Sequence, residues 1–461
     1  MSSDQRLRPT SIESQKDFYR RMIAIALPIV LQNLLISSLS FVDTLMIGQL
    51  GSDEIAAVGL ANQMFFLINL FYFGISSGAS IFISQYWGAG NREQIQKVMG
   101  IALTLGIAGA MIFSAVSILF PQQVMHIFTY DQSVVERGCQ YLRYVGISYI
   151  FSAVTAVYST TLRATGDAKT PLVIACFALT FNAVFNWLLI FGVGPFPRME
   201  VAGAALATTG SRFIEMIALI VLSQKKKTPA AMNLRNALRW DRPFIKVFFA
   251  TCLPVIVNEV FWSLGMTTYK IAFSRMGIDV IASVNVTEAI NSLFFVAMMG
   301  VSSATSIMIG VKIGEGDHET AARYGKKFVK IGFLLGMAVG ACMAVAAPFI
   351  PRLFNVPRNI YIMTSRSLLV GACLVPIKSV NMNIIVGILR SGGDTKFSMF
   401  TEMLGVWGVG VPCAFIGALL LNLPIWWLYL LLGLEELSKF VVGTLRVRSG
   451  RWLNDLARNP A

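Results

Sequence analysis

The chain has 461 residues, of which 55% are hydrophobic and 13% are charged, and its mean hydropathy is +0.66. A soluble globular domain carries about 25% charged residues, so this composition excludes that class and indicates a membrane protein. The six cysteines have no paired spacing, and the sequence contains two histidines. This pattern favours neither a disulfide framework nor a histidine-based metal site.

Apolar runs of the roughly 20 residues that a helix needs to cross a bilayer recur along the whole chain. Because backbone groups in lipid must be paired within their own segment, we expect an all-α membrane protein with 12 transmembrane helices. The runs predict helices near residues 22–45, 55–83, 98–120, 138–162, 171–193, 201–223, 247–272, 280–311, 329–351, 360–389, 397–421 and 423–445.

The net charge of +14 fits either a nucleic-acid-binding patch or an orientation signal. Most of the 38 Lys and Arg residues fall in the N-terminal tail, the even-to-odd connections and the C-terminal region. This asymmetry follows the positive-inside rule. We therefore expect a multi-pass protein of the cell (inner or plasma) membrane with both termini in the cytoplasm and no nucleic-acid partner. Residues 1–21 are polar and do not resemble a cleaved signal peptide.

The sequence repeats itself at an offset of 226 residues: Leu27-Pro28 returns as Leu253-Pro254, and Gly74 returns as Gly300. Six spans per copy predict two lobes of parallel topology, related by an axis along the membrane normal. We expect the two prolines to mark helix starts, where proline costs little; the alternative is a kink or hinge deeper in each helix. The predicted divisions are a cytoplasmic tail (1–21), an N-terminal lobe (22–223), a basic cytoplasmic linker (224–246), a C-terminal lobe (247–445) and a cytoplasmic tail (446–461).

The two copies differ in their ionisable residues. Asp43 corresponds to Tyr269 of the second copy, whereas Glu259 and Glu288 correspond to asparagines of the first. Charged groups inside membrane spans are costly and mark candidate functional sites. We predict that Asp43, Glu259 and Glu288 couple cation and substrate binding. The alternative is that neighbouring hydroxyl groups or Lys378 satisfy these carboxyls structurally.

A carboxyl group in a membrane span can exchange ligands, because burial favours its protonated form and a nearby cation favours its ionised form. Asp43 could therefore hold a proton and a cation in turn. Arg212 and Glu215 lie three residues apart on one helical face, and we interpret them as a structural ion pair. The repeated Leu-Arg-x-x-Gly-Asp-x-Lys segments, at 162–169 and 389–396, are also interpreted as structural helix ends.

Aromatic, amide and methionine side chains accompany these carboxylates along the chain. An aromatic chamber suits organic cations through cation–π and apolar contacts. The alternative is an ordinary apolar core or lipid-facing surface. The predicted cavity-lining or modulating residues are Gln63, Asn182, Asn186, Trp262, Tyr269, Phe294, Met298 and Lys378.

Several segments resemble, in order and spacing, the multidrug and toxic compound extrusion (MATE) family. The resemblance covers about residues 20–445, and Asn182-x-x-x-Asn186 is similar to the bacterial NorM-type branch. The segments that carry it are Ala26–Ile29, Phe41–Gly51, Ala56–Ala61, Gln85–Gly90 and Leu162–Asp167.

The resemblance implies an inner-membrane antiporter that expels organic cations in exchange for Na⁺ or H⁺. It places the family's acidic residue of the first helix on Asp43 and its helix-seven glutamate on Glu259. Many members carry an acidic residue in helix ten, where this chain has Lys378. A lysine there would repel Na⁺, so we expect H⁺ as the coupling ion, with Na⁺ at Asp43 or Glu259 as the alternative.

Two other functions fit the composition. A lipid-linked oligosaccharide flippase would need an arginine-rich cavity, whereas the charges predicted within the spans are mainly acidic. An intramembrane enzyme would need a catalytic constellation, and we recognise no metal-ligand pair or nucleotide-binding loop. We therefore predict a monomeric transporter of small organic cations in the lipid bilayer, which needs no cofactor beyond its coupling ion and is not an enzyme.

Overall fold

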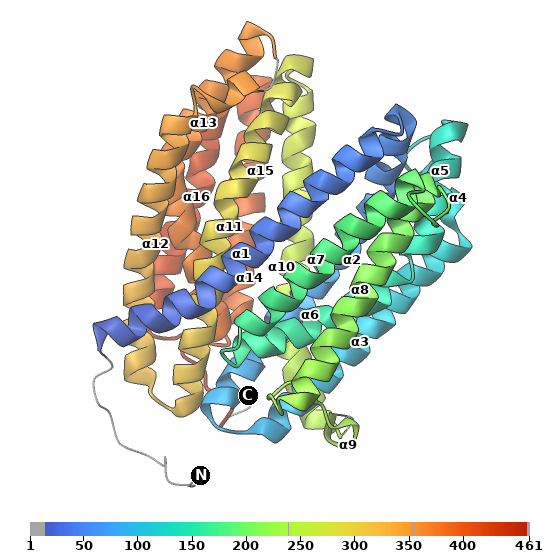
Figure 1. Ribbon diagram of the computed structural model, residues 1–461. Helices are drawn as coiled ribbons and strands as arrows, with labels where there is room; N and C mark the ends of the chain where they lie inside the picture. Colours follow the sequence, from blue (N-terminus) through green and yellow to red (C-terminus); the bar gives the residue numbers. More distant parts are fainter. Residues whose placement is uncertain (1–13, 238, 354–355, 459–461) are drawn as a thin grey trace.

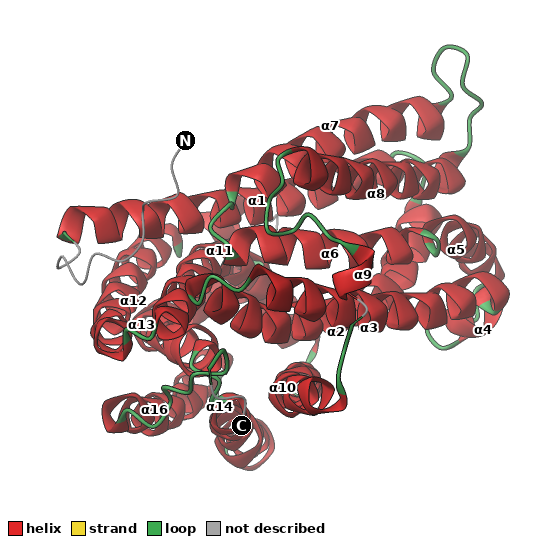
Figure 2. Cartoon of the chain, turned by 90° about the horizontal axis from the view of Figure 1, so that it is seen from below, coloured by secondary structure: helices red, strands yellow, loops and turns green. Residues whose placement is uncertain are grey.

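The computed structural model describes residues 14–237, 239–353 and 356–458, so residues 1–13 and 459–461 of the two predicted tails lie outside the described part. The described chain is folded into helices joined by short loops (Figure 2). The helices of the first half are α1 (Gln15–Gly48), α2 (Ser52–Gly88), α3 (Arg92–Leu119), α4 (Pro121–His126), α5 (Gln132–Val145), α6 (Ser148–Ala164), α7 (Lys169–Phe191), α8 (Glu200–Lys225) and α9 (Leu234–Ala237). Those of the second half are α10 (Arg242–Ser274), α11 (Ile278–Glu315), α12 (His318–Ala346), η1 (Ile350–Leu353), α13 (Arg358–Met382), η2 (Asn383–Leu389), α14 (Thr395–Met403), η3 (Leu404–Gly410), α15 (Val411–Phe415), η4 (Ile416–Leu420) and α16 (Ile425–Ser449).

Each of the twelve predicted spans corresponds to a helix or to consecutive helical segments. Ten described helical segments are long and apolar enough to cross a membrane, and α5 with α6 forms a further, bent span with an angle of 49°. The remaining predicted span, α16, carries Glu435, Glu436 and Lys439 near its middle, which lowers its apolar character. The prediction of an all-helical, multi-pass fold is confirmed.

Two helical bundles stand side by side, and the first helix of each half crosses between them. Figure 1 shows α1 running diagonally from the foot of one bundle to the top of the other. Phe18, near the start of α1, packs against Tyr324 and Phe328 of α12. Ile47, at the other end of α1, lies in a core formed with α2, α5 and α8. The two ends of α1 are therefore anchored in different bundles.

α10 crosses in the same manner. Phe248 and Cys252, in its first half, lie in a core with residues of α2 and α3. Tyr269 and Phe273, in its second half, lie in a core with residues of α15 and α16. The pseudo-symmetry of the sequence thus appears in the structure as a pair of crossing helices.

The prolines of the repeat lie inside these crossing helices. The prediction that they mark helix starts is wrong: α1 begins at Gln15 and α10 at Arg242, both well before Pro28 and Pro254. Polar and basic residues that precede the apolar runs are helical as well, so hydropathy alone placed the starts too late. A proline in a helix interior lacks the N–H that would bond to the fourth residue before it, so each crossing helix has a weakened point near its middle.

Glycines repeated between the halves sit at turns that need a left-handed backbone. Gly90 follows α2 with φ of 70°, and its counterpart Gly316 follows α11 with φ of 81°. Other residues adopt this region only at a cost, whereas glycine does so freely. The repeat therefore preserves the geometry of the loops as well as the helices.

The C-terminal segment after α16 joins the two bundles at the end where α1 begins. The side chain of Gln85, on α2, donates to the backbone carbonyls of Ser391 and Asn454 and accepts from the N–H of Leu456, at 2.9, 3.2 and 2.8 Å. Gln85 is fully buried. We call this set of contacts the Gln85 clasp.

Candidate functional site

Asp43 lies in the second half of α1, opposite two asparagines of α7. Asn186 donates from Nδ2 to Asp43 Oδ1 at 2.6 Å. Asn182 is one turn away on the same face of α7, and in one amide orientation its nitrogen lies 3.2 Å from the same oxygen. Both asparagines are almost completely buried. The spacing of four residues puts the two amides on one helical face, so Asp43 meets a pair of neutral hydrogen-bonding groups.

Asp43 and Asn182 line a cavity of about 50 Å³ between α1, α7 and α8. A water molecule needs about 10–15 Å³ of such space, so the cavity has room for a few waters or a small ion. Its polar lining consists of Ser40, Asp43, Asn182, Thr208, Ser211, Arg212 and Glu215. Two carboxylates and one guanidinium among these residues give the cavity an acidic balance.

Arg212 and Glu215 form the predicted ion pair, with Nη1 2.9 Å from Oε2. The pair also lines the Asp43 cavity, which the structural interpretation did not anticipate. The guanidinium carbon of Arg212 lies 5.9 Å from the centre of the Phe65 ring. Asn186 Oδ1 is buried and has no hydrogen-bond partner among the described residues. This free acceptor can serve a proton on Asp43 or a small cation beside it.

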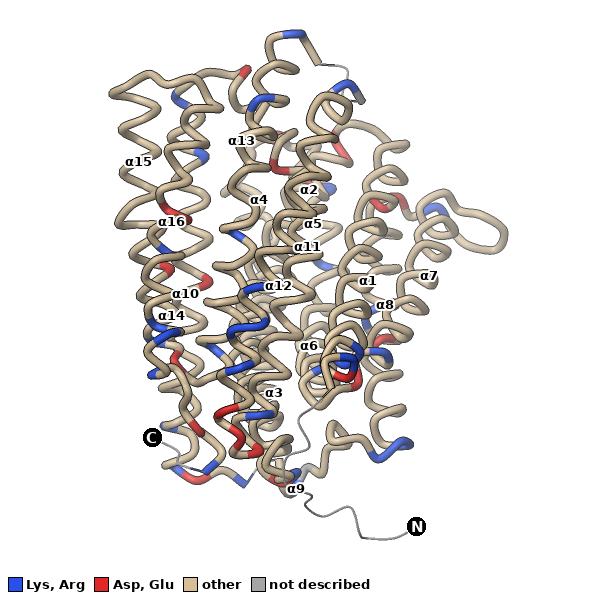
Figure 3. The backbone as a smooth tube through the Cα atoms, turned by 90° about the vertical axis from the view of Figure 1, so that its left-hand side faces the viewer, with Lys and Arg blue, Asp and Glu red and all other residues tan. Residues whose placement is uncertain are grey.

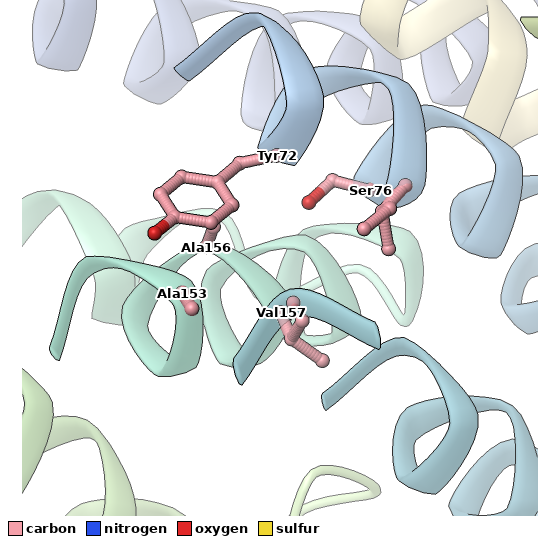
Figure 4. Close-up of a pocket in the computed structure, with 7 residues that line it drawn as sticks. Tyr72, Ser76, Ala153, Ala156 and Val157 are labelled. Atoms are coloured by element: carbon pink, nitrogen blue, oxygen red, sulfur yellow. The ribbon is translucent and has the colours of Figure 1, made fainter. Parts of the chain in front are cut away.

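A second hollow, between α2, α3 and α6, has a different character. Figure 4 shows Tyr72 and Ser76 of α2 facing Ala153, Ala156 and Val157 of α6. The hollow has no room for a water molecule, and no charged residue lines it. It is a packing defect in the N-terminal bundle rather than a binding site.

Glu259 lies apart from the Asp43 cavity and pairs with Arg390, with Oε1 2.8 Å from Nη2. Arg390 also donates to the hydroxyl of Ser77, on α2, at 3.3 Å. Arg390 belongs to the second Leu-Arg-x-x-Gly-Asp-x-Lys segment, for which sequence reasoning anticipated helix-end contacts. Its counterpart Arg163 does make such a contact, with the carbonyl of Ser159 at 3.2 Å. The two copies of the segment thus place their arginines differently.

The other predicted residues are dispersed over the second half and α2. Glu288 pairs with Lys270 at 2.9 Å, and both side chains are largely exposed. Met298 is buried in an apolar core with α12 and α13, and Phe294 packs against the same core. Trp262 packs beside α15 and α16, whereas Gln63 and Lys378 are exposed. Of the predicted residues, Asp43 and Asn182 line the described cavity, and Asn186 joins them through its hydrogen bond to Asp43.

Sequence reasoning missed a buried charged group in the C-terminal bundle. Lys439 lies 2.7 Å from Glu435 and 2.9 Å from Glu402, and Tyr269 donates to Glu435 at 2.6 Å. Figure 3 shows acidic and basic positions together at mid-height around α10, α14 and α16. A carboxylate and a lysine four residues apart in an apolar run are a recognisable ion-pair signal, and that signal was available at Glu435 and Lys439.

Comparison with known proteins identifies the family. A sequence model described as MatE matches residues 28–188 and 254–416, which together are more than half of the chain. The chain belongs to the MatE family. The two matches begin at Pro28 and Pro254. The separation of these two prolines equals the offset at which the sequence of the MatE chain repeats itself.

Relatives and solved structures agree along nearly the whole MatE chain. A probable multidrug resistance protein NorM of Thermotoga maritima is 26% identical over 418 residues, with 88% of this chain and 86% of the relative covered. The probable multidrug resistance protein YoeA of Bacillus subtilis is 25% identical, with 90% of each chain covered. The Vibrio cholerae MATE transporter VcmN in its bent form superimposes with a TM-score of 0.86 at 16% identity, over 95% of this chain and 99% of that one. At that identity the structural likeness shows the fold.

Proposed function

We propose that this MatE chain is a secondary active antiporter that exports organic cations in exchange for H⁺. The observation that carries the proposal is the Asp43 cavity, in which a carboxylate on a crossing helix meets Asn186 at 2.6 Å. Relatives described as probable multidrug resistance proteins support drugs and other organic cations as the substrate class. The acidic balance of the cavity favours a cationic cargo over the pyrophosphate of a lipid-linked sugar.

Coupling follows from competition for one carboxylate. An ionised Asp43 attracts a cation, whereas a protonated Asp43 is neutral and releases it. Asn186 suits both states, because its Nδ2 donates to a carboxylate and its unpaired Oδ1 can accept from a protonated carboxyl. Each ligand then shifts the conformational equilibrium by its difference in affinity for the two states.

Alternating access is assigned to the two bundles, which rock about the crossing helices α1 and α10. Both termini are assigned to the cytoplasmic side by the excess of Lys and Arg in the connections on that side. In the present conformation the cavity is too small for a bulky organic cation. Substrate entry therefore requires α1 to move relative to α7 and α8.

Efflux from proteoliposomes tests the proposal. The full chain is reconstituted with a fluorescent organic cation inside, and efflux is recorded under a H⁺ gradient, a Na⁺ gradient or neither. We expect the H⁺ gradient to accelerate efflux and Asp43→Asn to abolish that acceleration. Asp17→Asn, at the exposed start of the same helix, is the matched control. Normal gradient-driven efflux by the Asp43→Asn variant would contradict the role of Asp43, and acceleration by Na⁺ alone would contradict H⁺ coupling.

A further inference from the structure

The charged group in the C-terminal bundle centres on Lys439. Its ammonium lies 2.9 Å from Glu402 Oε1, on α14, and 2.7 Å from Glu435 Oε1, on its own helix α16. The Lys439 side chain is 5% exposed, and those of Glu402 and Glu435 are 13% and 7% exposed. One buried and one partly buried carboxylate thus share a single ammonium group.

The backbone around this group is shaped to admit the side chains. Gly405 and Gly410 lie in the π-helical segment η3, directly after Glu402. A Cβ atom at Gly405 would collide with the stem of Lys439, and one at Gly410 would collide with the hydroxyl of Tyr269. π-helical turns often occur at functional sites. The two glycines therefore open a place for Lys439 and Tyr269 against the backbone of η3.

A second carboxylate and its partners border the group. Glu436 accepts from Asn381 Nδ2 at 2.8 Å, and Lys378, on α13, is close enough to attract the Glu436 carboxylate. Asn381 is 3% exposed, and its Oδ1 has no hydrogen-bond partner among the described residues. Glu436 thus receives its described side-chain hydrogen bond from Asn381 rather than from Lys439.

A count of charge shows what the cluster lacks. Two carboxylates, Glu402 and Glu435, contact one ammonium group, Lys439, while Glu436 and the exposed Lys378 attract each other beside them. Tyr269, on α10, donates to Glu435, and the thiol of Cys413, on α15, lies near the same carboxylate. Glu259, also on α10, is already neutralised by Arg390. With every carboxyl ionised, the cluster carries one uncompensated negative charge, which one proton removes.

Glu402 is the carboxyl best placed to take that proton. Glu435 receives two described hydrogen bonds, from Lys439 and Tyr269, both of which stabilise its ionised form. Glu402 receives one, from Lys439, and it is more accessible than Glu435. Two carboxylates that share a site disfavour each other's charge, so the proton goes to the less stabilised one.

We propose that Glu402 is a second exchangeable proton site, set in the C-terminal bundle by Lys439, Glu435 and the glycines of η3. When Glu402 takes the proton, Lys439 pairs with Glu435 alone; when it releases the proton, Lys439 bridges the two carboxylates. This inference deepens the proposed H⁺ antiport and rests on it for its role in transport, but proton binding at Glu402 is measurable without transport.

Infrared difference spectroscopy of the purified full chain in lipid tests the site. As pH rises, the C=O band of protonated carboxyl groups declines, and we expect Glu402→Gln to lose one component of that decline. Asp43→Asn should retain the Glu402 component, and Glu93→Gln, on the exposed start of α3, should lose only the component of a solvent-exposed carboxyl and retain that of Glu402. If Glu402→Gln does not fold, Glu402→Asp should move the position or pH midpoint of the same component.

The outcomes separate this inference from the proposed function. A spectrum of Glu402→Gln or Glu402→Asp identical to that of the unchanged chain overturns the proton site. A Glu402 component that responds to Na⁺ at constant pH also overturns it, in favour of a metal cation. If the unchanged chain shows no H⁺-driven efflux but the Glu402 component is present, the antiport function is overturned and the proton site is supported.

Discussion

Asn186 donates a 2.6 Å hydrogen bond to the Asp43 carboxylate, which favours the ionised form of Asp43. A hydrogen bond to a charged group contributes about 1.5–3 kcal/mol. Asn182 lies close enough to compensate for part of a loss. The stability of the ionised form of Asp43 therefore depends on the hydrogen bonds that the two amides donate to its carboxylate.

Asn186→Ala should move the pH midpoint of cation binding to higher values. Without the donated hydrogen bond the ionised form of Asp43 is less stable, so protons compete more strongly with the cation. The expected shift is about 1–2 pH units, since about 1.4 kcal/mol corresponds to one unit. Binding of a fluorescent cation to the detergent-solubilised chain, measured across pH, provides the midpoint. Asn69→Ala, exposed on α2, is the control; an equal midpoint in both variants would rule out the role of Asn186.

For single residues, the sequence was informative where a charged residue interrupts an apolar run. An aspartate is rare within an apolar run, which made Asp43 a candidate. Asn182 and Asn186 were named from the family resemblance, and the structure places both beside Asp43. Thr208 and Arg212 were not predicted as part of the cavity, because nothing in the sequence specifies which face of α8 meets α1. Glu402 and Lys439 escaped for the same reason: their pairing depends on the packing of α14 against α16.

Elements are linked by the buried pair of Glu259 and Arg390, which ties α10 to the segment after η2 and, through Ser77, to α2. Removing one partner of a buried ion pair leaves an uncompensated charge, at a typical cost of about 3–5 kcal/mol. Removing both partners costs less. The difference in stability between the single and the double variant therefore shows whether Glu259 holds helices together or takes part in ion coupling.

Glu259→Gln should lower the thermal stability of the chain, and Glu259→Gln with Arg390→Met should restore most of the loss. Thermal unfolding in detergent, followed by intrinsic tryptophan fluorescence, measures both. The control is Glu200→Gln, which breaks the exposed pair with Arg198 and should change little, because exposed pairs contribute about 0–1 kcal/mol. A Glu259→Gln variant as stable as Glu200→Gln, with weaker ion coupling, would assign Glu259 to coupling instead.

The positions of the helices were predicted well, because they depend on the length of apolar runs. Bends and irregular turns were predicted less well, because they depend on tertiary packing. All twelve helical regions were located from their apolar runs, and ten, or eleven with the bent pair, are long and apolar enough to cross a membrane, because lipid demands a long apolar helix. The bend between α5 and α6 and the π-helical segments in the second half were not predicted, since they depend on tertiary contacts. The interior positions of Pro28 and Pro254 were missed because the flanking polar turns carry no hydropathy signal.

The whole molecule is held at one end by the Gln85 clasp, which joins α2 to the C-terminal segment and to Ser391. Three backbone groups depend on this one side chain. Rocking of the bundles that separates α2 from the second half must break these hydrogen bonds. The clasp thus adds to the energy that favours the present conformation.

Gln85→Ala should increase hydrogen–deuterium exchange in residues 450–458 and at the end of α2. The carbonyls and N–H that Gln85 serves would lose their partner, and each buried unpaired group costs about 1–3 kcal/mol. Exchange measured by mass spectrometry on the reconstituted chain is the readout. Gln63→Ala, exposed on the same helix, should leave exchange unchanged. Equal exchange at 450–458 in the two variants would show that the clasp does not hold the segment.

The three charges in the middle of α16 also bear on how the chain enters the bilayer during synthesis. An isolated helix with Glu435, Glu436 and Lys439 at its centre is a poor substrate for insertion, because each charge at that depth costs a few kcal/mol. The short connection at 421–424 makes α16 emerge directly after the segment that carries Glu402, the other carboxylate bonded to Lys439. The last two spans are therefore expected to enter lipid together, as a hairpin in which the lysine is already neutralised.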